Sequence, residues 1–312
     1  MNTLIRAAEV WLPSPDGTLL EFGGGWFENA PTFGAMSRAL CFGRAEGLPG
    51  HAWHEARPIL LKGFEGSYFQ RTAAAHAAGL RSAVALPMFV AERLTSVVVL
   101  FCGEDGAGTG AIELWRNDPR VTTDLSLADG RFGGSQELES LTRDAYLPAG
   151  SGLPGLAWQR RSTVYIDDIE SDARFLRTQA AAAAGLVRGL AIPCATLTRV
   201  TWILSLLAAA HMPVARRVES WIAGIGAGEF VRGFGFCEAA GNLAADSTTI
   251  ISTATPGPIA ATFASGVAGI VRLADAPREP PIVAAEKAGH GWLLTLPIAG
   301  DAGADEVLAL YF

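Results

Sequence analysis

Cysteine, methionine and long apolar runs are scarce in this chain of 312 residues. Its four cysteines include no Cys-x-x-Cys pair, which excludes a disulfide framework and predicts small buried thiols in a reducing compartment. The longest strongly apolar stretch, Trp202–Ala210, is far shorter than the roughly 20 residues of a membrane span. A secretory signal is not expected, because Arg6 and Glu9 interrupt Met1–Leu12. These absences predict a cytoplasmic protein without a membrane partner.

Basic clusters are equally scarce. The net charge is −7, and Arg216-Arg217 is the nearest approach to a basic run. Without a continuous basic stripe the chain could not displace counterions from a phosphate backbone, so nucleic acid is excluded as a partner. Disorder is excluded as well, because 50% of the residues are hydrophobic and only 18% are charged. The length and composition therefore predict two or three globular domains.

What the sequence does contain is an internal repeat. Three landmarks recur in one order at offsets of 104 to 106 residues: Glu-x-Trp at Trp11, Trp115 and Trp221; Ala-Gly at Gly79, Gly185 and Gly289; and a proline eight residues later, at Pro87, Pro193 and Pro297. A fourth, Gly-Leu-Pro-Gly-x-Ala-Trp, ends at Trp53 and Trp158 and is reduced to Pro256-Gly257 in the third copy. We therefore predict three domains, 1–103, 104–209 and 210–312, the third of them degenerate.

Each copy has the same expected order of secondary structure, ββαβαββ. Two strands separated by a turn are followed by a polar helix such as Gln136–Tyr146, and Gly-Leu-Pro-Gly then opens a short helix. A strand at 58–61 or 163–166 precedes an alanine-rich helix at 69–78 or 175–184, which a glycine ends. Two closing strands complete an antiparallel sheet, so the predicted class is α+β.

The first two copies resemble the GAF domain family. In copy two the resemblance is carried by Gly152–Trp158, Val164–Ile169, Asp172-x-x-Phe175, Ala184-Gly185-Leu186 and Ile192-Pro193. Copy one is similar at Gly47–Trp53, Phe69, Ala78–Ser82 and Leu86-Pro87, and copy three at Ala288-Gly289, Leu296–Ile298 and its final strand. The resemblance implies three tandem GAF-like domains, each a mostly antiparallel sheet with flanking helices.

The resemblance also implies a function. Members of the family are usually non-enzymatic sensory or regulatory domains that bind a small molecule between sheet and helices and often form dimers, so a homo-oligomer is expected. The Asn-Lys…Phe…Asp-Glu pattern of the cyclic-nucleotide class is absent, as is the Cys-His dipeptide that tethers bilins. Cyclic nucleotides and bilins are therefore disfavoured as ligands, and the cofactor stays unknown. No kinase, cyclase or DNA-binding sequence accompanies the repeats, so we expect the output to pass through a separate protein partner.

Five residues are the candidate ligand-binding residues: Trp53, Arg81, Trp158, Phe175 and Arg188. Trp53 and Trp158 hold equivalent positions, where a flat ring either forms the wall of a pocket or packs against the sheet. Arg81 and Arg188 follow the glycine that ends the alanine-rich helix, and each either binds an anion or pairs with a surface carboxylate. Phe175 belongs to a segment that carries the resemblance.

No metal ligand is expected. Asp167-Asp168 with Asp172 lacks the loop of a calcium site, and His51 with His54 has neither a third ligand nearby nor a counterpart in copy two.

No catalytic residue is expected either, although two other functions stay open. One is a protein-interaction scaffold whose pockets are filled by side chains. The other is a thiol-based enzyme like methionine sulfoxide reductase, which needs paired cysteines. Here Cys41 and Cys102 belong to copy one, Cys194 to copy two and Cys237 to copy three.

Overall fold

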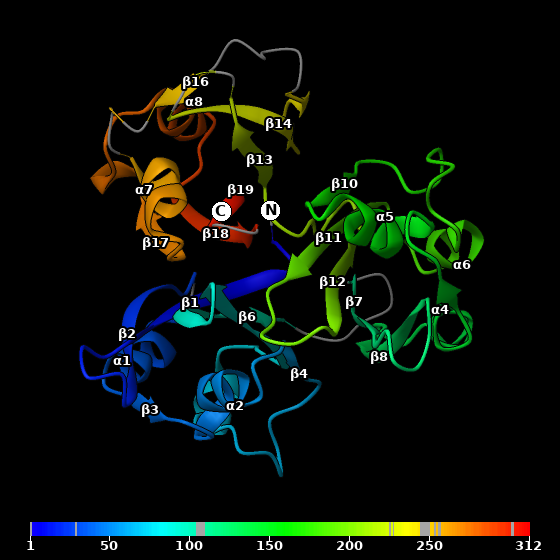
Figure 1. Cartoon of the computed structure of the whole chain (residues 1–312), viewed down its shortest axis with the longest axis horizontal. Helices are drawn as coiled ribbons and strands as arrows, with labels where there is room; N and C mark the ends of the chain where they lie inside the picture. The colour runs from blue at the N-terminus through cyan, green and yellow to red at the C-terminus, as the bar shows by residue number, and fades with distance from the viewer. Residues whose placement is uncertain are drawn as a thin grey trace.

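The structure is a computed structural model that describes residues 2–28, 30–103, 110–224, 226, 228–243, 250–252, 254, 257–300 and 303–312. Its strands form three antiparallel sheets, which Figure 1 shows as three groups around a common centre. Each sheet takes its strands from one of the three predicted copies. The predicted boundary between the first two copies borders residues 104–109, and these lie outside the described residues.

The strand order is the same in all three sheets. The first is β3-β2-β1-β6-β5-β4, from β1 (Ile5–Pro13), β2 (Leu19–Trp26), β3 (Cys41–Gly43), β4 (Ile59–Leu61), β5 (Ser82–Val90) and β6 (Arg93–Cys102). The second is β9-β8-β7-β12-β11-β10, from β7 (Gly110–Asn117), β8 (Leu125–Arg131), β9 (Tyr146–Leu147), β10 (Val164–Ile166), β11 (Arg188–Cys194) and β12 (Thr201–Ala208). The third is β15-β14-β13-β19-β18-β17, from β13 (Arg217–Ala223), β14 (Glu229–Cys237), β15 (Gly241–Asn242), β17 (Gly269–Arg272), β18 (Trp292–Ala299) and β19 (Ala304–Tyr311), with β16 (Ile250–Ser252) paired to β14. These antiparallel sheets with helices confirm the predicted α+β class.

The helices are short. They are α1 (Pro31–Arg38), α2 (Gly47–Glu55), α3 (Thr72–Ala77), α4 (Gln136–Arg143), α5 (Gly152–Arg160), α6 (Thr178–Ala183), α7 (Pro258–Ser265) and α8 (Pro280–Lys287). None of the helices in the described part of the chain has the length and apolar character that crossing a bilayer requires.

Two details of the predicted order were wrong. The alanine-rich helices α3 and α6 begin three residues later than predicted, because Arg71 and Arg177 take non-helical backbone angles ahead of them and reach into the core. In copy two the polar helix ends at Arg143, and Tyr146 starts the short strand β9. Strand β3 holds the same place in copy one.

The central strands of each sheet are buried on both faces, which explains the unbroken apolar run in β6. Successive side chains of a strand point to opposite faces, so Val97 and Phe101 face the helices while Val98 faces the centre. The central core joins all three copies, since Val98, Leu204 and Leu308 hold equivalent positions and all lie in it. Each sheet therefore separates a core of its own from one shared core.

The Gly-Leu-Pro-Gly motif is required by backbone geometry. Gly152 has a φ of +64° and the equivalent Gly47 a φ of +55°, a region that L-residues rarely adopt. Gly155 instead lies against the preceding loop: its carbonyl accepts from the Gly150 N–H at 2.7 Å, and a Cβ added to it would lie 2.5 Å from the carbonyl oxygen of Pro148. The motif thus docks α5 tightly against the end of β9.

Replacing Gly155 by alanine is expected to lower the free energy of unfolding by about 1–3 kcal/mol, because a rigid carbonyl must move to admit the methyl group. Gly63→Ala is the matched control, since Gly63 is exposed and an added Cβ would meet nothing within 4 Å. Urea unfolding followed by circular dichroism would measure both variants. Equal midpoints for the two would contradict this account of the motif.

The three sheets contact one another in a closed ring. Copies one and two are linked by Lys62 and Asp129, whose Nζ and Oδ1 are 2.8 Å apart. Copies two and three meet where the ring of Tyr165 stacks on that of Phe234, with centroids 5.9 Å apart. Copies three and one are closed by stacked rings 4.0 Å apart, those of Phe312 and Trp26. Each copy therefore has a neighbour on both sides.

Candidate functional site

The space between sheet and helices in copy one is filled by side chains. Trp11 is fully buried there, surrounded by phenylalanines, and the guanidinium carbon of Arg71 lies 4.5 Å from the ring centroid of Phe33. Phe69 and Phe101 contact the same guanidinium at 5.3 and 5.8 Å. This interior, where the sequence resemblance places a ligand, is thus occupied by the protein itself.

A buried carboxylate organises this interior in copies one and two. In copy one Glu9, fully buried, accepts from the Trp11 indole at 3.0 Å, from the Ser37 hydroxyl at 2.6 Å and from Arg71 at 2.5 and 3.0 Å. The network is repeated in copy two, where Glu113 accepts from Trp115 at 2.8 Å and from Arg177 at 2.6 and 3.0 Å. Thr142 stands at the position of Ser37 and accepts from Arg177, but its own hydroxyl donates to the Leu138 carbonyl. Burial of a carboxylate demands such pairing, which explains why Glu-x-Trp recurs.

The third copy keeps the carboxylate but takes its arginine from another strand. Pro281 stands where copies one and two have Arg71 and Arg177, eight residues before the shared glycine. Arg217, at the position of an alanine in the other copies, donates to Glu219 at 2.5 and 3.1 Å. Arg232 adds a second ion pair at 3.1 Å, and the Tyr311 hydroxyl donates at 2.9 Å. The buried carboxylate therefore keeps a cationic partner although the source of that cation has moved, and it gains a second one.

Two equivalent cavities lie outside these interiors, each beside a motif tryptophan. The Trp53 cavity has a volume of about 610 Å³ and the Trp158 cavity about 630 Å³. They share three further positions of the repeat, from the hairpins that join β5 to β6 and β11 to β12: Arg93 with Arg199, Leu94 with Val200, and Thr95 with Thr201.

A neighbouring copy completes the wall of each cavity. Val267 of copy three lines the Trp53 cavity, and Phe89 of copy one and Gly300 of copy three line the Trp158 cavity. The contact is specific at the first site, because the hydroxyl of Thr95 donates to the carbonyl of Gly266 at 2.7 Å. Both cavities are therefore products of the ring and not of a single copy.

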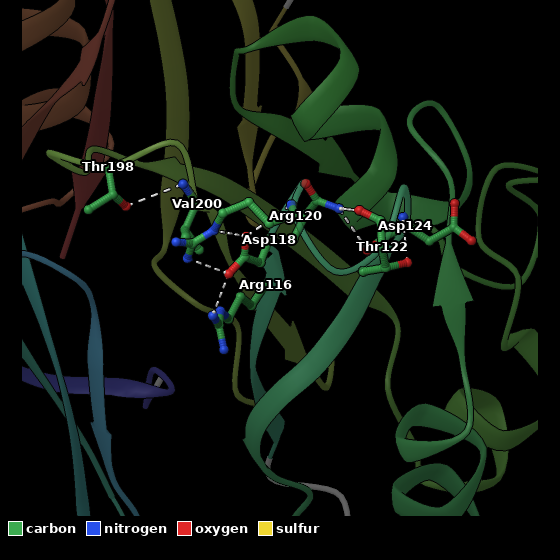
Figure 2. Close-up of polar contacts among 8 residues, drawn as sticks. Arg116, Asp118, Arg120, Thr122, Asp124, Thr198 and Val200 are labelled. Atoms are coloured by element: carbon green, nitrogen blue, oxygen red, sulfur yellow. Dashed lines mark hydrogen bonds and ion pairs between the residues drawn. The ribbon is translucent and has the colours of Figure 1, made fainter.

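A third cavity, which we call the inter-repeat cavity, lies between copies one and two. It has a volume of about 670 Å³ and shares Thr198, Val200 and Trp202 with the Trp158 cavity. Figure 2 shows one edge of it, where Asp118 holds Arg116 and Arg120 together, at 3.1 and 2.8 Å, and the loop with Thr198 and Val200 runs nearby. Hydrogen bonds from Arg120 lower the pKa of Asp118 to about 2, so this carboxylate is ionised at neutral pH.

The structure brings only two of the five candidate residues to these cavities. Trp53 and Trp158, both half-buried, form cavity walls. Phe175 is 4% exposed and packs in the interior of copy two, below the guanidinium of Arg177.

The two candidate arginines make contacts within the protein. Arg81 donates to the carbonyls of His76 and Leu80, both at 3.1 Å. Arg188 donates to Glu238 of copy three at 3.1 and 3.2 Å and also to the carbonyl of Asp167. Arg188 thus links copies two and three.

The other groups considered for chemistry lie apart. Cys41 and Cys102 are on strands separated by β2 and β1, roughly 14 Å along the sheet at the usual strand spacing. Burial raises the pKa of the Cys194 thiol to about 12, which keeps it protonated. The His51 ring stacks on Tyr68, and within the described ranges no three His, Cys, Asp or Glu side chains form a group that could hold a metal ion.

Sequence reasoning missed the arginines of the buried network. A signal was available, since Phe69-x-Arg71-Thr72 recurs 106 residues later as Phe175-x-Arg177-Thr178. The neighbouring copies that complete the cavity walls gave no comparable signal, because nothing in one repeat specifies which other repeat will pack on it.

Comparison with solved structures finds partial matches. The GAF domain of A. aeolicus nlh2 in an inactive state matches with 13% identity and a TM-score of 0.26, over 32% of this chain and 59% of that one. Free methionine-R-sulfoxide reductase from Neisseria meningitidis, in complex with its substrate, matches with 18% identity and a TM-score of 0.24, over 32% and 53%. A GAF domain/HD domain protein from Geobacter sulfurreducens matches with 18% identity and a TM-score of 0.28, over 34% and 66%.

The matches therefore span about a third of this chain and less than two thirds of each of those three structures. No protein-family model matches the chain, and no curated protein matches it.

Proposed function

We propose that this chain is a non-enzymatic regulatory protein, built of three GAF-like repeats, that binds small molecules between its repeats and acts through a separate protein partner. The observation that carries the proposal is the pair of equivalent cavities beside Trp53 and Trp158, of about 610 and 630 Å³. Volumes of this size suit a metabolite or cofactor. Because copy one fills its interior with aromatic rings and Arg71, the cavities between copies are the better candidates for a ligand.

The chemistry of the walls supports binding over catalysis. Each cavity presents an indole, one arginine of the hairpin and at least one threonine, a combination suited to holding a partly apolar ligand with a polar end. Cys194 lines the Trp158 cavity, but its raised pKa leaves little thiolate for nucleophilic chemistry at neutral pH.

Native mass spectrometry of the purified protein, followed by thermal shift with nucleotides, linear tetrapyrroles and amino acids, tests the proposal. A ligand of the Trp158 cavity should stabilise the chain by about 2.7 kcal/mol at about a hundredfold excess over its Kd. Trp158→Leu should weaken that ligand about tenfold, because it removes the aromatic wall.

Tyr146→Leu is the control, since Tyr146 is a 64% exposed aromatic of the same copy and lines none of these cavities. Equal affinities for the two variants, or a folded protein that no compound stabilises, would contradict the proposal.

A protein-interaction scaffold is the second candidate, and one surface favours it. Copy two exposes Leu141, Tyr146 and Leu176 by 49%, 64% and 60%, and exposed apolar side chains of this size are what a protein interface would cover. This candidate predicts that ligands leave the melting temperature unchanged.

A further inference from the structure

The inter-repeat cavity is a site of different chemistry from the two tryptophan cavities. We propose that it binds a small carboxylate with an apolar body, the carboxylate held by Arg116 and Arg57 and the body lying against Leu60 and Leu114. The proposal is independent of the proposed function, because Arg116 lines neither the Trp53 cavity nor the Trp158 cavity.

The cavity exists because the contact between copies one and two lacks the aromatic pair that fills the contact between copies two and three. Leu60 and Asp129 occupy the repeat positions of Tyr165 and Phe234, as the strand registers show. Tyr165 and Phe234 stack and close the contact between copies two and three. At the corresponding place copies one and two have only a leucine and a carboxylate, which leaves about 670 Å³ open.

The charges around the cavity favour an anion. Glu55 forms an ion pair with Arg57, and Asp129 is paired with Lys62 at 2.8 Å, so these two carboxylates are neutralised. Asp118 is shared by Arg116 and Arg120, two cations on one anion, which leaves one excess positive charge. Figure 2 shows Asp124 on the other side of the turn from these arginines, and none of its hydrogen bonds within the described residues is with either of them.

Arg116 is held in position and still has donors to offer. Its Nη2 donates to Asp118, whereas its Nε and Nη1 have no hydrogen-bond partner among the described residues. Asp118 is itself fixed by Arg120, which donates from Nε at 2.9 Å and from its backbone N–H at 3.1 Å. An arginine positioned in this way loses little side-chain entropy when it binds a carboxylate.

The guanidinium of Arg57 lies beside the same indole as that of Arg116, the indole of Trp202. The guanidinium carbon of Arg57 is 5.3 Å from the ring of Trp202, and that of Arg116 is 5.9 Å from it. Trp202 is only 8% exposed and packs in the central core, so it forms a fixed floor for both arginines. Cationic groups beside an apolar wall recognise an acid that has an apolar body, and they discriminate against its neutral amide.

Isothermal titration of the full chain with benzoate and with its neutral analogue benzamide tests the proposal. Benzoate is expected to bind with a Kd of about 1 mM or lower, and benzamide at least about tenfold more weakly. Arg116→Gln should weaken benzoate by about tenfold or more, because it removes the charge-assisted donors. Ala128→Trp, at an exposed position of the cavity wall, should abolish binding by filling the space without disturbing the core.

Arg143→Gln is the matched control. It also removes one positive charge from copy two, but Arg143 pairs with Glu139 on α4 and does not line the cavity, so the affinity for benzoate should fall by no more than about threefold through long-range electrostatics. Three results would overturn the proposal: no heat of binding at about 10 mM benzoate, equal affinities for benzoate and benzamide, or benzoate binding that neither Arg116→Gln nor Ala128→Trp weakens.

Discussion

Replacing Arg177 by methionine is expected to lower the free energy of unfolding by about 3–5 kcal/mol, because Glu113 would keep a buried charge without its cation. The Arg177 side chain is 9% exposed and that of Glu113 is fully buried, so water cannot take over the role of the guanidinium. Denaturant unfolding of the purified variant would measure the loss.

Arg143→Met provides the matched control. Arg143 pairs with Glu139 at 2.6 Å on the exposed face of α4, where an ion pair contributes about 0.5 kcal/mol or less. The double variant Glu113→Leu with Arg177→Met should be more stable than Arg177→Met alone, since it removes the uncompensated charge. A loss for Arg177→Met as small as that for Arg143→Met would show that the buried network does not stabilise copy two.

In copy three the loss of one arginine should lower the free energy of unfolding by less than in copy two. Glu219 has two arginine partners, Arg217 and Arg232, and accepts from Trp221 and Tyr311 as well. Arg217→Met should therefore cost less than Arg177→Met, because one cation remains beside the carboxylate.

Two buried groups of copy three should give opposite pH dependences that nearly cancel in the natural protein. Burial raises the pKa of Glu279 to about 7, so the folded chain holds a proton there that the unfolded chain has released. Its contribution to stability falls as the pH rises from about 4.5 to about 7. Burial, with Arg217 and Arg216 nearby, lowers the pKa of His290 to about 4, so stability rises with pH from about 4 to about 6.5.

Single substitutions should separate the two effects. Glu279→Gln should be more stable than the natural chain at pH 8 and equal to it at pH 4.5, whereas His290→Gln should be more stable at pH 4.5 and equal at pH 8. Each difference should amount to at most about 2 kcal/mol, because nearby solvent screens part of the effect of the pKa shift.

Melting temperatures of both variants between pH 4 and pH 9 would show these crossing profiles. Both groups are buried: Glu279 is 1% exposed with no hydrogen-bond partner for either carboxylate oxygen in the described part of the chain, and His290 is 6% exposed with Nε2 3.8 Å from the Cys237 sulfur. Parallel profiles for the two variants would refute this assignment.

The recurring order of strands was the part of the fold that the sequence could predict. Trp11 recurs because its indole pairs with a buried carboxylate, and Gly79 because its φ is +71°, so their spacing reports the shared order of strands. The arrangement of the sheets could not be predicted in this way. In β6 both faces are apolar, and an apolar face does not say whether a helix or another sheet will cover it.

The candidate site shows the same limit. Trp53 and Trp158 were identified by their repetition, and the structure places both beside cavities. Arg188 was considered as an anion ligand, but it pairs with Glu238, a residue 50 positions away that a one-dimensional pattern cannot associate with it. The inter-repeat cavity depends on Leu60 and Asp129, two positions at which the copies differ. A repeat is recognised only by the positions at which its copies agree, so it could not indicate this cavity.

The shared central core has a consequence for how this protein can change over time. In a linear array a repeat contacts only its neighbours and can be gained or lost as a module. Here Val98, Leu204 and Leu308 meet in one core, so a substitution in any copy is felt by the other two. Deleting one copy would expose an apolar face on each of the two that remain. The three inner faces therefore have to stay compatible with one another, whereas the Gly-Leu-Pro-Gly motif lies outside the shared core and can differ in the third copy.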